Sequence, residues 1–332
     1  MKGIVLDLDS KSKISYQEVP SKSLETDQVR IQIKAAALNH RDEWCRQGKY
    51  PNLTIGVILG SDGSGVIIEL GSDVKGFQIG QEVIINPAMN WGENQEAQSK
   101  DFLIMGTPHD GTLSEEVVVA SDRVHAKPNH LNFEEAAALP LAGLTAYRAI
   151  MYQAKTQATE KVLISGFGGG VAQFAAQFAL GLGAEVYITT SSPAKLEKAI
   201  SLGAKGGFDY RDSQWVDNAN AEVGGFDVII DGASGDGLND LIKVAKPGGR
   251  IVIYGATQGN PSTLEARRIF WNQIKIMGST MGSDQDFDDM LTFVQNYQIK
   301  PIVDAIFPFA KAEEAFDKMR DGKQMGKIVL VP

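Results

Sequence analysis

The sequence predicts an α/β protein of two domains, one an irregular all-β unit and the other a doubly wound parallel sheet. Two different sequence patterns along the chain indicate this division. As far as about residue 125, short β-like runs are interrupted by Gly, Pro, Asn and Asp, whereas from about residue 128 strand-like runs alternate with segments of helical period. Length points the same way, because 332 residues exceed the size at which one hydrophobic core usually keeps growing.

The all-β unit is predicted from runs rich in β-forming residues that are bounded by turn residues. These runs are QVRIQIKAAAL (28–38), SGVIIEL (64–70), EVII (82–85) and SEEVVVA (114–120). Such short, irregularly spaced strands are typical of an all-β domain rather than of an alternating α/β sheet.

The parallel sheet is predicted from six strand-like runs, at 161–165, 184–190, 205–210, 226–231, 249–255 and 274–280. Helical segments between them include 169–183, 192–204 and 237–249, and each closes at Gly or just before one. Alternation of this kind fits a doubly wound sheet. The chain then finishes with a helix, a strand, a second helix and a last strand, at 284–297, 302–307, 312–323 and 327–331.

Composition favours a cytoplasmic protein that acts on small molecules. The 43% hydrophobic content supports a packed globule, no apolar run approaches the ~20 residues of a spanning helix, and the N-terminus has no apolar signal segment. The net charge of -9, without a Lys/Arg cluster, argues against nucleic acid as a partner. We therefore expect a small-molecule substrate, and neither nucleic acid nor membrane as a partner.

Metal ligands are scarce in the sequence. Cys45 is the only cysteine, which excludes disulfides within the chain and cysteine-based structural zinc sites. The four histidines form no HExxH motif and no i,i+4 pair on an evident helix. We expect no bound metal, although a site assembled from distant segments stays open.

The sharpest motif is the glycine-rich turn in VLISGFGGGVA (162–172), where a predicted strand opens into a predicted helix. A backbone without side chains lets a pyrophosphate approach closely, and the helix N-terminus then offers free N–H groups and its positive dipole end. The alternative is a turn that merely needs positive φ. The position at the start of a β/α series favours dinucleotide binding. The candidate cofactor residues are Gly166, Gly168, Gly169, Gly170 and Val171.

The end of the second strand of this series favours NADPH over NADH. NAD-binding units usually carry Asp or Glu there to hold the ribose hydroxyls, whereas this chain has Thr and Ser, followed by Ser192 and Lys195. Hydroxyls and an ammonium suit a 2'-phosphate, which a carboxylate would repel. The alternative is that Ser192 and Pro193 cap the next helix and Lys195 is a solvated surface charge.

The order of these motifs resembles the medium-chain dehydrogenase/reductase superfamily, in particular its quinone oxidoreductase branch and zinc-type alcohol dehydrogenase-like neighbours. The resemblance rests on GLTAYRA, VLISGFGGGVAQFAAQ, TTSSPAKLEKAISLGA, FDYR, FDVIIDGAS, KPGGRIVIYG and GKIVLV. It implies a GroES-like irregular β-barrel catalytic domain at 1–127, completed by 283–332, and a Rossmann domain with a six-stranded sheet at 128–282. The cofactor would lie in the cleft between them.

The same resemblance implies further NADPH contacts at Thr145, Tyr210, Gly255 and Lys327, which match the family's motif positions. Two of these residues have plain structural alternatives. Tyr210 could be an aromatic residue of an edge strand, and Lys327 could be a solvated charge.

Departures from the family pattern bear on the metal. Zinc enzymes of this superfamily carry a Cys ligand where this chain has Asn39, and a His-Glu pair where it has Ser61-Asp62, and their four-cysteine lobe is absent. Neutral Asn and Ser are poor zinc ligands. We expect Asn39 and Tyr50, by analogy with quinone oxidoreductase-like relatives, to be the catalytic donors to the substrate oxygen.

Four other residues near these positions have weaker assignments. Asp42 is expected to fix its loop, either as a helix-start residue or as the partner of an arginine. Asp62 is expected to accept hydrogen bonds from a cation such as Arg41 or from backbone amides. His40 could relay a proton or make only local hydrogen bonds. Cys45 is assigned to packing.

The leading functional hypothesis is an NADPH-dependent, metal-free reductase of quinones or α,β-unsaturated carbonyl compounds. Two alternatives stay open: a zinc-type alcohol dehydrogenase with an atypical site, and an NADPH-binding sensor or structural protein with little turnover. Because the superfamily often pairs the edge strands of its Rossmann sheets, we expect a homodimer joined through 274–280.

Overall fold

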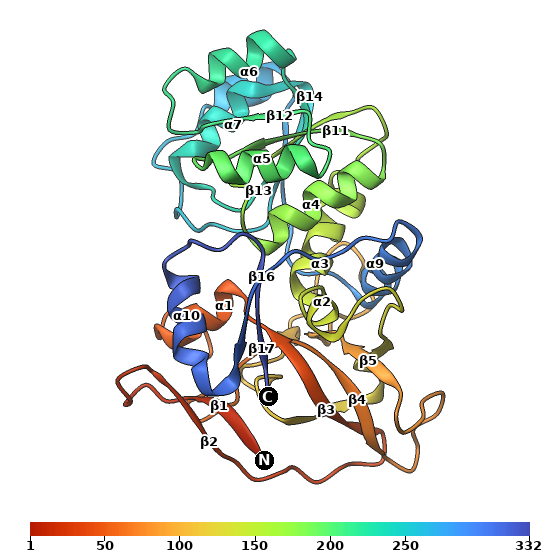
Figure 1. Ribbon diagram of the computed structural model, residues 1–332. Coiled ribbons are helices and arrows are strands. Elements are labelled where there is room, and N and C mark those ends of the chain that lie inside the picture. Colours follow the sequence, from red (N-terminus) through yellow and green to blue (C-terminus); the bar gives the residue numbers. More distant parts are fainter. The chain divides into compact units, whose positions relative to one another are not determined.

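Strands from both ends of the chain pair in the first of two structural units, which comprises Met1–Ala142 and Gly282–Pro332 (Figure 1). The second unit comprises Gly143–Met281. The computed structural model describes all residues, 1–332. None of its helices combines the length and the apolar composition that crossing a membrane requires.

The strands of the first unit are β1 (Lys2–Leu6), β2 (Ile14–Glu18), β3 (Gln28–Ala37), β4 (Asp62–Leu70), β5 (Glu82–Ile85), β6 (Ala88–Met89), β7 (Leu103–Ile104), β8 (Glu116–Ala120), β9 (Val124–Ala126), β16 (Val303–Pro308) and β17 (Lys327–Val331). Its helices are α1 (His40–Arg46), η1 (Ser121–Arg123), α2 (Phe133–Ala137), α9 (Asp284–Asn296), η4 (Phe309–Lys311) and α10 (Ala312–Arg320). The boundary between the units falls within α3 (Pro140–Tyr147).

The largest sheet of this unit has the order β16-β17-β3-β4-β5-β9, with β8 also paired to β3. The alternating sequence of β3 explains its central position, because Val29, Ile31 and Ile33 are buried while the residues between them are not. The pairing of β17 with β3, and of β3 with β4, brings the ends of these three strands side by side. This arrangement is the irregular, GroES-like β unit that the sequence predicts.

The first unit extends to Ala142, beyond the predicted end at residue 127. The reason is the packing of α2, whose Ala137 joins Ala35 and Ala37 of β3 in a small buried cluster. Ser64 on β4 also donates a hydrogen bond to the carbonyl of Phe133 over 2.6 Å. Residues after 127 therefore belong to the β unit by their contacts.

The strands of the second unit are β10 (Lys161–Ile164), β11 (Glu185–Thr189), β12 (Gly206–Phe208), β13 (Phe226–Asp231), β14 (Ala245–Ile253) and β15 (Lys275–Gly278). Its helices are η2 (Arg148–Gln153), α4 (Gly170–Gly181), α5 (Pro193–Ser201), α6 (Trp215–Val223), η3 (Gly235–Gly237), α7 (Leu238–Val244) and α8 (Ala266–Trp271). All six predicted strands are present.

The six strands form one parallel sheet in the order β12-β11-β10-β13-β14-β15. The central strands β10 and β13 are buried on both faces, which explains their continuous apolar runs. Leu163 and Ile229 join residues of α6 and α7 in one core cluster, and the alternate positions Val162 and Ile230 are also fully buried. The order reverses between β10 and β13, so the loops after these strands flank the switch point where open α/β sheets bind ligands.

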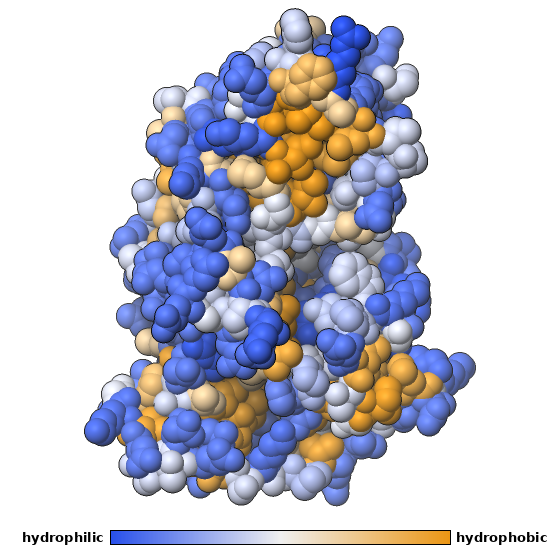
Figure 2. All heavy atoms as spheres, turned by 180° about the vertical axis from the view of Figure 1, so that it is seen from behind, coloured by the Kyte–Doolittle hydropathy of each residue, from blue (hydrophilic) through white to orange (hydrophobic).

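The second unit also exposes large apolar side chains. Phe270 and Trp271 of α8 are 68% and 77% exposed, and they precede β15, the edge strand of the sheet. Figure 2 shows an apolar area on this unit. An exposed apolar area of this kind is typical of an interaction surface.

Candidate functional site

The glycine-rich turn links β10 to α4. Gly166 has a φ of 62°, a conformation that favours glycine, and Gly169 is the N-cap of α4. The side chain and carbonyl of Thr189 at the end of β11 hold the turn, since they accept from Gly166 N over 3.0 Å and from Phe167 N over 2.9 Å. A Cβ at Gly166 or Gly169 would meet no atom within 4 Å, so this backbone faces open space. The turn thus offers the bare approach to a helix N-terminus that a pyrophosphate needs.

A buried acid braces the turn from the neighbouring strand. Asp231, the last residue of β13, accepts a hydrogen bond from the Ser165 hydroxyl and from the backbone N–H groups of Ala233, at 3.2 Å, and Ser234, at 2.8 Å. These bonds tie together the ends of β10 and β13 at the switch point. The sequence analysis did not single out Asp231, and its only signal is the lone acid that ends the apolar run FDVIID.

Lys195 lies beside the same turn. It sits in the first turn of α5, where its backbone N–H donates to the Ser192 hydroxyl over 3.5 Å, so Ser192 is also the helix cap that the alternative interpretation expected. The Lys195 side chain reaches Gly168, because a Cβ added there would be 2.6 Å from Nζ. No carboxylate pairs with this ammonium. The structure therefore brings together two motifs that are separate in the sequence.

Hydroxyl groups and a second cation lie in the segments that follow β11 and β12. The Tyr210 hydroxyl is 3.0 Å from the Ser191 hydroxyl, and Arg211 donates to the Ser191 carbonyl over 2.6 Å. Tyr210 is half exposed, and Arg211 also pairs with Asp209 at 3.0 Å. Arg211 is a candidate phosphate-binding residue that the sequence analysis missed, although it follows Tyr210 directly in FDYR.

The other predicted cofactor residues have structural contacts of their own. Thr145 is buried, with its hydroxyl 3.8 Å from the Met281 sulfur. Gly255 approaches the next loop closely, because a Cβ there would be 2.9 Å from the carbonyl oxygen of Gly232. Val171 is half-buried in the first turn of α4. The cofactor roles of Thr145 and Gly255 stay predictions.

The first unit holds a buried network at the ends of β17, β3 and β4. Lys327 Nζ donates to Asn39 Oδ1 over 2.6 Å and to Asp62 Oδ2 over 2.8 Å, and Asn39 Nδ2 donates to Asp62 Oδ2 over 2.9 Å. Asp62 is fully buried, and only 3% of Lys327 and 7% of Asn39 are exposed. Lys327 is therefore not a solvated charge. Asp62 Oδ1 accepts from the backbone N–H of Leu141 over 2.8 Å, which completes the acid's partners.

Asp62 accepts hydrogen bonds from a cation and from a backbone amide, as expected, but the cation is Lys327 and not Arg41. Arg41 donates instead to the Ser61 hydroxyl and to the Met105 carbonyl, each over 2.6 Å. Its guanidinium also lies over the ring of half-buried Tyr50, 4.7 Å from the centroid. Lys327 reaches Asp62 because its strand is the neighbour of β3, a pairing that the sequence does not reveal.

Asp42 fixes the start of α1, as expected. Its carboxylate accepts the backbone N–H of Asn39 over 2.8 Å in a capping box, and it lies 4.0 Å from Arg41 Nη1. Burial raises the pKa of Asp42 to about 6, against the opposing charge of Arg41. Asn39 is thus held by its backbone through Asp42 and by its side chain through Lys327 and Asp62.

The remaining polar and aromatic candidates divide between core and surface. Cys45 is buried in the apolar core, where burial raises the pKa of its thiol to about 12, as its packing role predicts. His40 is exposed at the start of α1 and faces Trp44 at 6.4 Å between ring centroids. A proton relay through His40 stays a prediction.

The donor set around Asn39 does not fit a zinc ion. Asn39 and Ser61 are neutral, Asp62 is engaged by an ammonium and a backbone amide, and no group of three or more His, Cys, Asp or Glu residues could hold a metal. Arg41 donates to Ser61, the residue that replaces the zinc enzymes' histidine, which adds a positive charge where a cation would have to enter.

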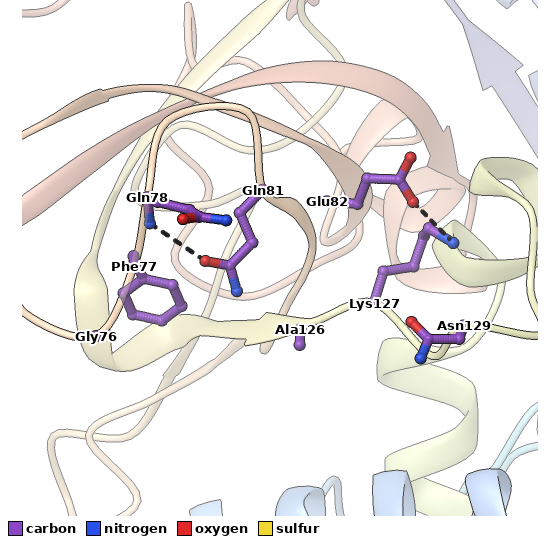
Figure 3. A pocket seen from close by; sticks show the side chains of 8 residues that line it. All are labelled: Gly76, Phe77, Gln78, Gln81, Glu82, Ala126, Lys127 and Asn129. Carbon is purple, nitrogen blue, oxygen red and sulfur yellow. Dashed lines mark hydrogen bonds and ion pairs between the residues drawn. The ribbon is translucent and has the colours of Figure 1, made fainter.

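A separate surface pocket in the first unit carries none of the predicted site residues. Its wall includes Phe77, Gln81 and the ion pair of Glu82 with Lys127, whose Nζ–Oε2 distance is 3.2 Å. Figure 3 shows these two charged side chains pointing toward each other. The two charged side chains of this pocket are therefore paired with each other.

Comparison with known proteins gives matches over both units. The family Alcohol dehydrogenase GroES-like domain matches residues 25–129, and the family Zinc-binding dehydrogenase matches residues 170–296. The zinc-type alcohol dehydrogenase-like protein YogA of Leptosphaeria maculans is 35% identical over 91% of this chain and 90% of its own. The 2-methylene-furan-3-one reductase of Solanum lycopersicum is 32% identical over 93% of this chain and 73% of its own. A crystal structure of an NAD-dependent alcohol dehydrogenase has a TM-score of 0.95 at 34% identity, with 100% of both chains covered.

Proposed function

Because this chain belongs to the medium-chain dehydrogenase/reductase superfamily of oxidoreductases, we propose that it is an NADPH-dependent reductase of quinones or α,β-unsaturated carbonyl compounds and uses no catalytic metal. The observation that carries this proposal is the buried network of Asn39, Asp62 and Lys327, which stands where zinc relatives place ligands. An ammonium and a carboxamide supply hydrogen bonds there but no Lewis acid.

The residues around the glycine-rich turn support NADPH as the cofactor. The positive dipole end of α4 suits the pyrophosphate, and Lys195, without a carboxylate partner, lies beside Gly168. Ser191, Tyr210 and Arg211 form a polar cluster at the end of β11, where NAD-binding units carry an acid. A 2'-phosphate would gain charge-assisted hydrogen bonds in these surroundings.

A conjugated acceptor suits the donors of the first unit. When bound, NADPH would supply a hydride to the conjugated acceptor, and negative charge would then develop on the acceptor's oxygen. Asn39 keeps one amide hydrogen that Asp62 does not use, and this N–H can donate to the developing oxyanion. The Tyr50 hydroxyl is the second donor, on a ring that Arg41 holds in place. Water then supplies the proton to the enolate or phenolate.

The similarity to alcohol dehydrogenases makes alcohol oxidation the competing function. Steady-state assays with NADPH and NADH against quinones, enones and simple aldehydes, and with NADP⁺ and NAD⁺ against alcohols, separate the two. We expect the highest kcat/KM for NADPH with a conjugated acceptor, and no loss of rate after treatment with a chelator. Dominant alcohol oxidation with NAD⁺, or stoichiometric zinc in elemental analysis, would overturn the proposal. Tight NADPH binding without turnover would favour a sensor.

We also propose that the chain is a homodimer joined through β15. This strand is an edge of the parallel sheet, so one side of its backbone has no partner strand. The exposed Phe270 and Trp271 lie just before it in the chain. A second copy of the same edge would satisfy the free backbone groups and cover the aromatic side chains.

A further inference from the structure

We propose that Lys327 is a positioning residue whose buried ammonium fixes the Asn39 carboxamide in the one orientation that offers an N–H to the substrate oxygen. The sequence motif alone assigns Lys327 only to cofactor binding. The inference rests on the proposed function, because it assigns Asn39 the role of oxyanion donor in that reaction.

The two partners of the Asn39 carboxamide demand the same orientation. Lys327 can only donate, so it requires Oδ1 on its side, whereas the Asp62 oxygen nearest Asn39 accepts a hydrogen from Nδ2. A rotation of the amide by half a turn would place Nδ2 against the ammonium and Oδ1 against the carboxylate. Both hydrogen bonds are charge-assisted, so the rotated form loses two strong contacts and gains two repulsive ones.

The partners are themselves fixed by the fold. Asp62 opens β4 opposite Ala37, the last residue of β3, and its backbone carbonyl accepts from the Thr112 hydroxyl over 2.7 Å. Lys327 opens β17, and its backbone N–H donates to the Ile302 carbonyl over 2.9 Å. The ammonium therefore projects from a rigid strand rather than from a mobile loop.

A glycine sets the start of this strand. Gly326 has a φ of 119°, and a Cβ there would be 2.2 Å from the carbonyl oxygen of Ile302. Any larger residue would displace the backbone that carries Lys327. The position of the ammonium is thus specified by main-chain packing as well as by its two acceptors.

The charges of the network balance. Lys327 and Asp62 form a buried ion pair with a 2.8 Å Nζ–Oδ2 distance, and Asn39 is neutral. The ammonium orients Asn39 without adding net charge to the site. A metal ion at Asp62 would have to displace this ammonium from the carboxylate. Removing Lys327 would leave the Asp62 carboxylate buried without its cation. A variant that removes both charges is therefore needed beside the single variant.

The kinetic test compares Lys327→Met, Asn39→Ala and the double variant with both changes. Methionine keeps the apolar stem of the lysine but cannot hold Oδ1. We expect each single variant to lower kcat with a quinone about 100-fold, as loss of an oxyanion donor does. The NADPH Kd should change less than about threefold, because the lost contact acts in the transition state and not in cofactor binding. The double variant should be no worse than Asn39→Ala alone, because both changes remove the same function. Losses that multiply, or a Lys327→Met defect confined to the NADPH Kd, would overturn the proposal.

A second measurement does not depend on turnover. In protein with ¹⁵N-labelled asparagine, the side-chain NH₂ signals of Asn39 are identified by their loss in Asn39→Ala. We expect slow amide exchange and two well-separated proton signals in the wild type, and faster exchange with shifted signals in Lys327→Met. Unchanged signals would overturn the positioning role even if the enzyme is a quinone reductase. A wild type inactive on quinones and enones, but with the expected NMR change, would refute the proposed function and leave the orientation role intact.

If Lys327→Met does not fold, Lys327→Met with Asp62→Asn replaces it in both measurements. This pair removes the uncompensated charge, while the carboxamide oxygen introduced by Asp62→Asn can still accept from Asn39 Nδ2. We expect the same loss of kcat and the same faster exchange, because the hold on Asn39 Oδ1 is still missing. Wild-type kcat in this charge-free variant would show that Lys327 serves stability alone.

Discussion

The ammonium of Lys195 lies against Gly168, so close that a Cβ at Gly168 would be 2.6 Å from Nζ. Two segments separated by an entire helix and strand thus form one positively charged surface at the start of α4. A cation here adds to the dipole of the helix and to the free N–H groups of its first turn. In the proposed function this ammonium supplies a counter-charge for the cofactor's phosphate groups, which a simple strand-to-helix connection would not need.

Lys195→Ala tests the choice of cofactor. We expect the Kd of NADPH to rise about 10- to 100-fold, the value of one charge-assisted hydrogen bond, while the Kd of NADH rises less than about threefold. Fluorescence titration with both cofactors measures this. Lys198→Ala, on the same helix, is the matched control and should leave both values unchanged. Equal losses of affinity for NADPH and NADH would indicate that Lys195 contacts the pyrophosphate. Lys195 would then no longer support selectivity for NADPH.

Gly169→Ser separates a phosphate-binding turn from a turn that only needs glycine for its shape. Gly169 has a φ of -79°, which serine adopts readily, and a Cβ there meets no protein atom within 4 Å. Serine is also a better N-cap than glycine, so the melting temperature should stay the same or rise. The NADPH Kd should nevertheless increase at least about tenfold, because the side chain occupies the approach to the helix N-terminus. An unchanged Kd would contradict dinucleotide binding at this turn.

The fold follows from the sequence where the strands are long and apolar. All six strands of the parallel sheet are predicted, and the central strands β10 and β13 are the clearest, because burial on both faces makes their runs continuously apolar. Helix α6 is not predicted, since WVDNANAEV combines Asn and Asp with only three buried apolar residues, Trp215, Ala219 and Val223. The first unit ends at Ala142 and not at the predicted residue 127. The sequence does not show this, because alanines such as Ala137 pack closely without giving a strong hydrophobic pattern.

The candidate site follows from the sequence only within single segments. The glycine-rich turn and the capping box of Asn39 with Asp42 are local, and motif spacing is enough to find them. The pairing of Lys327 with Asp62 depends on β17 lying beside β3, which is a long-range choice of strand order. Arg41 is the example of a cation expected for Asp62, but its guanidinium binds Ser61 and the Met105 carbonyl instead.

Asp42→Asn should change how stability depends on pH. Because burial raises the pKa of this carboxyl from 3.8 unfolded to about 6 folded, the native state binds the proton more tightly than the unfolded state. The contribution of Asp42 to wild-type stability should therefore fall as the pH rises from about 4 to about 6 and change no further above that. The variant loses this contribution, so its stability relative to wild type should improve by about 1–3 kcal/mol between pH 4 and pH 7.

Urea unfolding followed by circular dichroism at both pH values measures this difference. Asparagine retains a side-chain oxygen for the backbone N–H of Asn39, so the capping contact is preserved. Asp286→Asn, which changes the same capping-box position in α9, is the matched control. Parallel stability curves for wild type and Asp42→Asn would show that Arg41 compensates the buried carboxylate fully.

Replacing Phe270 and Trp271 together by Glu should separate the proposed dimer. Both side chains are highly exposed in the single chain, so the change should not disturb its core. In a two-fold assembly each negative charge would lie in a surface that faces its own copy, which destabilises association. Light scattering coupled to size exclusion should give twice the chain mass of 35.8 kDa for the wild type and 35.8 kDa for the variant. Ile79→Glu, at a 67% exposed position in the first unit, should remain a dimer. A monomeric wild type, or a variant that stays dimeric, would contradict association through the surface beside β15.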